Sequence, residues 1–105
     1  MKPVTRKMAD DCTNAFSKQI SGSKTRVTTS VNFNSKKLAK WLQQVAPHCS
    51  QIQVRFGTYT KAHALTKELE GRTTVFFYAC DENGELALDE SGNEIPPVNQ
   101  GTVFP

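Results

Sequence analysis

RTTVFFYAC, residues 72–80, is the most apolar strand-like stretch of this 105-residue sequence. Its unbroken apolar run from Val75 to Cys80 is the longest in the chain, and it is far too short to cross a bilayer. A strand that is apolar on both faces needs cover on both of them. The stretch therefore predicts a strand near the centre of a sheet.

The acidic stretch CDENGELALDESGNE, residues 80–94, follows this strand and resembles a calcium loop at first sight. An EF-hand loop with Gly84 at its sixth position would need an oxygen ligand where Ala79 stands. Asp81 and Asp89, by contrast, lie eight residues apart, and each is followed three residues later by a glycine. This spacing is typical of successive tight turns, so we predict a short meander whose middle segment returns along residues 72–80.

Two further strands are predicted upstream, at residues 26–33 and 51–59. Both alternate apolar and polar residues, which is the pattern of a half-buried strand. In the second strand Ile52, Val54 and Phe56 share one face, and Arg55 lies on the other.

Two helices are predicted. The first covers residues 35–46, because Asn34 is a good N-cap and Pro47 disfavours helix at the residue before it. The second covers residues 4–20, where apolar side chains recur every four residues and form an amphipathic stripe. We expect this stripe to dock on the protein's own sheet.

The predicted fold is therefore α+β, with an antiparallel sheet of about four strands, one helix packed on a face and an N-terminal amphipathic helix. A single domain is expected over residues 1–105, with the N-terminal helix and a linker at 1–24 and the α+β core at 25–105. The predicted core consists of Leu38, Trp41, Leu42, Val45, Ile52, Val54, Phe56, Val75 and Phe77.

Charge is divided unevenly along the chain. Residues 1–55 hold ten Lys/Arg against two Asp/Glu, whereas residues 56–105 hold three against eight, giving net charges of +8 and −5. A basic half of this kind can bind nucleic acid or an acidic partner, or pair with the acidic half of a second copy. The candidate residues for a partner or nucleic-acid face are Arg26, Lys36, Lys37, Lys40 and Arg55.

Thiol and imidazole chemistry has little support in the sequence. Cys12, Cys49 and Cys80 are an odd number without close pairing, which indicates reduced thiols, and we expect Cys12 and Cys80 to be small buried residues. His48 and His63 do not form a zinc-binding spacing with them. No catalytic, metal or cofactor-binding residue is predicted, although a Cys/His pair assembled in space remains an open alternative.

The segments SVNFNSKKLAKWLQQV, IQVRFGTY, GRTTVFFYACDENGELALDESG and PPVNQG together resemble a family of small bacterial proteins to which no activity is assigned. The resemblance covers residues 30–105 and is most distinctive at residues 71–75, at Asn99 and at Gly101. The chain departs from the family pattern at Val98, where an aromatic is usual, and at residues 103–105, which replace a Cys-Pro-Pro ending. The resemblance supports the fold and implies no catalytic residues.

These observations favour a small non-catalytic protein that acts through a protein partner or through its own oligomer. A nucleic-acid-binding protein is the second hypothesis, and an enzyme with a spatially assembled site is the third. We expect a cytoplasmic location and no membrane partner, because two aspartates stand at residues 10–11, where a signal peptide would carry its apolar region.

Overall fold

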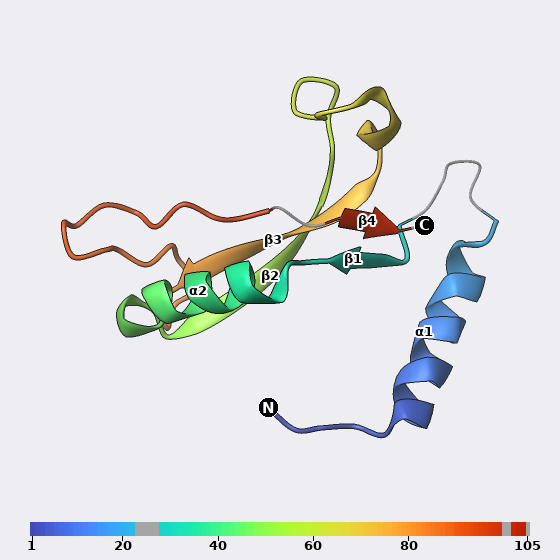
Figure 1. Ribbon diagram of the computed structural model, residues 1–105, viewed down its shortest axis with the longest axis horizontal. Helices are drawn as coiled ribbons and strands as arrows, with labels where there is room; N and C mark the ends of the chain where they lie inside the picture. Colours follow the sequence, from blue (N-terminus) through green and yellow to red (C-terminus); the bar gives the residue numbers. More distant parts are fainter. Residues whose placement is uncertain (23–27, 100–101, 105) are drawn as a thin grey trace.

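The computed structural model of the protein describes residues 1–22, 28–99 and 102–104. The elements in chain order are α1 (Arg6–Ile20), β1 (Ser30–Asn32), α2 (Ser35–Val45), the 3₁₀ turn η1 (Ala46–His48), β2 (Gln51–Thr58), the 3₁₀ turn η2 (Lys67–Leu69), β3 (Thr73–Cys80) and β4 (Thr102–Phe104). Figure 1 shows α2 lying across β2 and β3, with α1 standing apart at the edge of the molecule.

The central unit is the antiparallel pair β2–β3. The two strands align over their whole length, from Gln51 opposite Cys80 to Thr58 opposite Thr73. Their bounds match the predicted strands at 51–59 and 72–80, which are confirmed. Since paired residues share a face, Ile52, Val54 and Phe56 lie on the same face as the odd-numbered residues of β3.

The acidic stretch forms the predicted meander along the other edge of β3. Asp81 and Asp89 each accept two backbone N–H bonds through Oδ1, from the residues two and four positions later. Gly84 and Gly92 have φ values of 83° and 81°, which glycine adopts without steric cost. Between the turns, Ala87 N–H donates to the carbonyl of Ala79 at 2.9 Å. The turn interpretation is confirmed.

The predicted sheet of about four strands is only partly found. The described strands form two antiparallel pairs, β2–β3 and β1–β4, and Val98, which precedes β4 in the chain, forms an isolated bridge with Phe77 of β3. The meander and Val98 occupy the edge of β3 that β2 leaves open, so β1 has no place beside β3. It pairs instead with residues 102–104, and it is shorter than the predicted strand at 26–33, whose first two residues lie outside the described ranges.

Helix α2 confirms the prediction for residues 35–46 to within one residue. The Oδ1 atom of Asn34 accepts from the backbone N–H of Lys37 at 3.0 Å, and the helix passes into η1, which contains Pro47. Its inner face packs Val45 and Trp41 onto β3 and the meander. The Trp41 and Phe77 ring centroids lie 6.2 Å apart.

We predict that Asn34→Ala lowers the free energy of unfolding by about 1 kcal/mol, because the first-turn N–H of Lys37 then loses its acceptor. Urea unfolding followed by the fluorescence of Trp41, the single tryptophan, measures this change. Asn34→Ser is the control, since serine also caps helices and should preserve most of the stability. If Asn34→Ala lowered the free energy of unfolding no more than Asn34→Ser does, the side-chain cap would contribute nothing to stability.

The core is smaller than predicted and lies at one end of the sheet. Its buried cluster consists of Val45, Ala79, Ala87 and Ile95, with Trp41, Cys49 and Ile52 packed against it, and Cys80 is also fully buried, as expected. Leu42, Val54 and Phe56, which were predicted to belong to it, are exposed. Two of the buried residues come from the meander, because its returning segments cover the end of β3 that also lies under α2.

Helix α1 forms as predicted but does not dock on the sheet. The hydroxyl of Thr5 caps it by accepting from the N–H of Met8, and none of its residues is buried. The expectation that Cys12 is buried is therefore wrong, because the face that carries it has no sheet against it. Neither α1 nor any other described helix is long and apolar enough to span a membrane.

Candidate protein-interaction surface

One face of the β2–β3 pair changes from covered to uncovered along its length. Ile52 lies under α2, whereas Val54 is 46% exposed and Phe56 is 81% exposed. All three side chains point to the same face, because residues two apart in a strand do so. Helix α2 has only eleven residues, and its packing contacts are with the Ile52 and Ala79 end of the strands. Helix α2 does not reach the other end.

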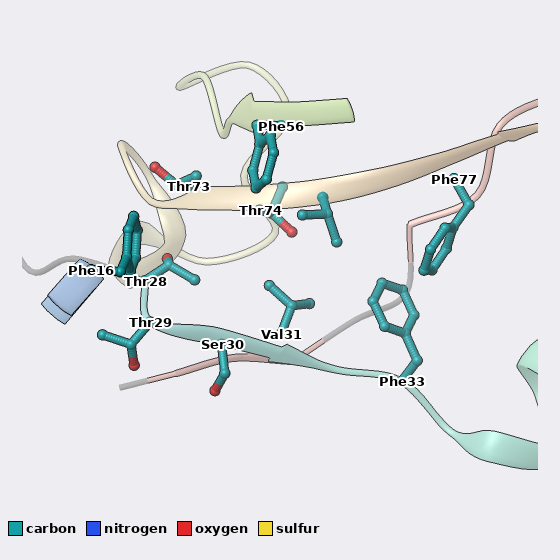
Figure 2. A pocket seen from close by; sticks show the side chains of 11 residues that line it. Phe16, Thr28, Thr29, Ser30, Val31, Phe33, Phe56, Thr73, Thr74 and Phe77 are labelled. Atoms are coloured by element: carbon teal, nitrogen blue, oxygen red, sulfur yellow. The ribbon is translucent and has the colours of Figure 1, made fainter. Parts of the chain in front are cut away.

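An apolar groove of about 610 Å³ lies at this uncovered end, between β3 and β1. Figure 2 shows Phe56 and Phe77 entering it from the β2–β3 side, and Val31 and Phe33 from the opposite side. The Phe33 and Phe77 rings meet at 4.7 Å between centroids and close one end. The lining consists of Phe16, Thr28, Thr29, Ser30, Val31, Phe33, Phe56, Thr73, Thr74, Val75 and Phe77.

Five of the eleven lining residues are Ser or Thr, but the surface that the groove exposes is mainly apolar. Thr74 is fully buried, and its hydroxyl lies 3.4 Å from Asn99 Oδ1, while Asn99 Nδ2 donates to the hydroxyl of Tyr59 at 2.9 Å. Thr28 is also buried, and its Oγ1 atom has no hydrogen-bond partner in the described part of the chain. The groove thus offers mainly apolar surface, which suits the side chains of another polypeptide.

The candidate basic residues do not form one surface. Lys36, Lys37 and Lys40 are exposed on α2, which covers the Ile52 face of the sheet. Arg55 lies on the opposite face, where its guanidinium stacks 4.0 Å from the centroid of Tyr78 and its Nε donates to Gln53. Arg26 lies outside the described residues.

The thiols and imidazoles are also dispersed. Cys12 is exposed, Cys49 is half-buried and Cys80 is buried, and all three are free. His48 Nε2 lies 3.9 Å from the highly exposed Glu90 carboxylate. Within residues 1–22 and 28–99, no group of three or more His, Cys, Asp or Glu side chains is placed to hold a metal ion.

The exposure of Val54 and Phe56 could not be read from the sequence, because their alternation is the same as that of a covered strand. The relative lengths of the predicted helix and strand gave a partial signal. Helix α2 is about 16 Å long at 1.5 Å per residue, and β2 is about 27 Å long at 3.4 Å per residue. One short helix cannot cover such a strand along its whole length.

No family model matches the chain, and searches among curated proteins and among solved structures give no match either. The resemblance to the bacterial family therefore stays a prediction.

Proposed function

We propose that this protein is a small non-catalytic interaction module that acts through a protein partner or through self-association. The observation that carries the proposal is the uncovered apolar surface formed by the groove together with Val54 and Phe56. Contiguous exposed apolar surface of this kind, bordered by polar residues, marks sites of protein interaction.

The total surface of the chain supports the same conclusion. The accessible surface is 8379 Å². A compact monomer of 11.7 kDa would expose roughly 5,900 Å². The surplus is roughly 2,500 Å² and includes the surface of α1, none of whose residues is buried. A stable interface of standard size needs about 800 Å² from each partner. The radius of gyration, 16.0 Å, likewise exceeds the value of about 13 Å expected for this length.

The surface chemistry favours a protein over a nucleic acid as the partner. Phosphate recognition needs several cations on one surface. The lysines of α2 and Arg55 lie on opposite sides of the sheet, and none of the described residues that line the groove between β1 and β3 is charged. An apolar surface of this composition gains most of its binding free energy from contact with other apolar side chains.

We predict that Phe56→Asp disrupts the interaction at least a hundredfold, because it places a carboxylate at the most exposed aromatic position of the surface. Affinity capture of the tagged protein from lysate, combined with sedimentation velocity of the purified protein, measures the effect. Leu65→Asp is the matched control, since Leu65 is an equally apolar side chain, 90% exposed, that lies in the 59–72 connection. Circular dichroism establishes that both variants fold.

A complex, with another protein or with itself, that persists after nuclease treatment and is lost only in Phe56→Asp is the expected result. Material that disappears on nuclease treatment would favour the nucleic-acid hypothesis and overturn the proposal. A chain that stays monomeric and captures nothing would overturn it as well.

A further inference from the structure

We propose that the outer edge of β2 pairs antiparallel with β2 of a second copy of this chain, across a twofold axis at Val54. The inference rests on the proposed function and names self-association as its form. The proposed interface consists of the outer edge of β2 and the exposed side chains of Val54 and Phe56.

Among the described residues, no backbone partner lies along the outer edge of β2. The N–H of Tyr59 donates to the carbonyl of Arg72, so backbone groups of odd-numbered residues in this strand point to β3. The N–H and C=O groups of Ile52, Val54 and Phe56 therefore point away from β3, and no described strand lies on that side. An edge of eight residues without proline is a ready template for another strand.

The pattern of side chains restricts the register of such a pair. Both apolar faces must coincide, so even-numbered residues must lie opposite even-numbered ones. A twofold axis at Arg55 would place the two arginines opposite each other, and like charges in that position are destabilising. An axis at Val54 instead places each Arg55 opposite Gln53 of the second copy, an amide that already accepts from Arg55 within one chain.

The same axis places Phe56 of each copy opposite Ile52 of the other. Beside Ile52 lies a second hollow of about 350 Å³, which we name the edge hollow. It is lined by Leu42, Ala46, Cys49, Ser50, Gln51 and Ile52. A projecting phenyl ring and a hollow thus occur four residues apart on one edge strand, which is the self-complementary arrangement that a twofold interface requires.

The pairing accounts for three exposed apolar side chains together. The exposed Phe56 ring, which borders the groove in the single chain, would turn to the outer edge, enter the edge hollow of the second copy and cover its Leu42, and the two Val54 side chains would meet at the axis. These residues are 81%, 37% and 46% exposed in the single chain. The association would also convert two two-stranded hairpins into one four-stranded antiparallel sheet, whose size is more typical of an independently stable sheet.

Disulfide trapping of the full-length protein tests the register. Val54→Cys is made in a background of Cys12→Ser; Cys49 remains because it lines the edge hollow, and Cys80 remains because it is fully buried. The same background without Val54→Cys is the blank. Paired residues in a hydrogen-bonded position have Cα atoms about 5.5 Å apart, within the range that a disulfide spans. Mild oxidation with oxidised glutathione should therefore convert most Val54→Cys protein to a covalent dimer, whereas Arg55→Cys and Thr58→Cys in the same background should yield at least tenfold less.

The alternative outcomes are distinguishable. A noncovalent dimer that is trapped by Arg55→Cys instead would overturn the proposed register, and one trapped by none of the three variants would overturn the β2 edge as the interface. In either case the proposed function stands. A chain that is monomeric at millimolar concentration but captures a different protein would also overturn this inference alone. Absence of both dimer and captured protein would overturn the proposed function as well.

Discussion

Ile95→Ala should lower the free energy of unfolding by about 2–5 kcal/mol, which is the usual loss when a buried isoleucine is truncated. Ile95 is only 7% exposed and packs with Val45, Ala79 and Ala87 in the single buried cluster of the described residues. Domains of this size are stable by about 5–15 kcal/mol, so the variant should lose a large part of its stability.

The matched control is Leu88→Ala, in the same meander. Leu88 is 54% exposed, so its truncation should change stability by less than about 1 kcal/mol. Both variants are measured by urea unfolding at one fixed protein concentration, with the fluorescence of Trp41 as the probe. A loss of stability in Ile95→Ala as small as that in Leu88→Ala would show that the meander is not part of the core.

The apparent stability of the wild-type protein should rise with its concentration if the chain self-associates through β2. Unfolding of a dimer to two chains is favoured by dilution, so a hundredfold increase in concentration should stabilise the folded state by about 2.7 kcal/mol per mole of dimer. The midpoint of urea unfolding, measured at several concentrations, reports this shift.

Phe56→Asp supplies the comparison for this measurement. Its side chain is 81% exposed in the single chain, so the substitution should not disturb the core. The midpoint of the variant should be independent of concentration, while Leu65→Asp should behave like the wild type. A wild-type midpoint that is constant over the hundredfold range would contradict self-association and leave a different protein as the partner.

Several elements were predictable because their signals are local. The Asn34 cap and Pro47 bound α2, and the paired Asp81 and Asp89 turns appear where their spacing places them. Helix caps and tight turns depend on the residue types at a few neighbouring positions, so these residues predict them directly. The alternation of β2 likewise predicted which side chains share a face.

Other features depend on segments that are distant in the chain. β1 pairs with residues 102–104, about seventy positions later, because the meander occupies the edge of β3 that β1 would have used. The burial of Ala87 and Ile95 has the same origin, since neither is part of a strongly apolar run. No local sequence pattern shows whether β1 or the meander pairs with this edge of β3.

The candidate surface shows the same division. The amino-acid pattern alone places Val54 and Phe56 on the apolar face of a strand, because alternation follows from the backbone of a single segment. That this face is covered at Ile52 and open at Phe56 follows from the packing of distant segments, because cover depends on where a short helix and the meander lie on the sheet. The free edge of β2 was decided in the same way, by which strands pair and which side of them remains without a neighbour.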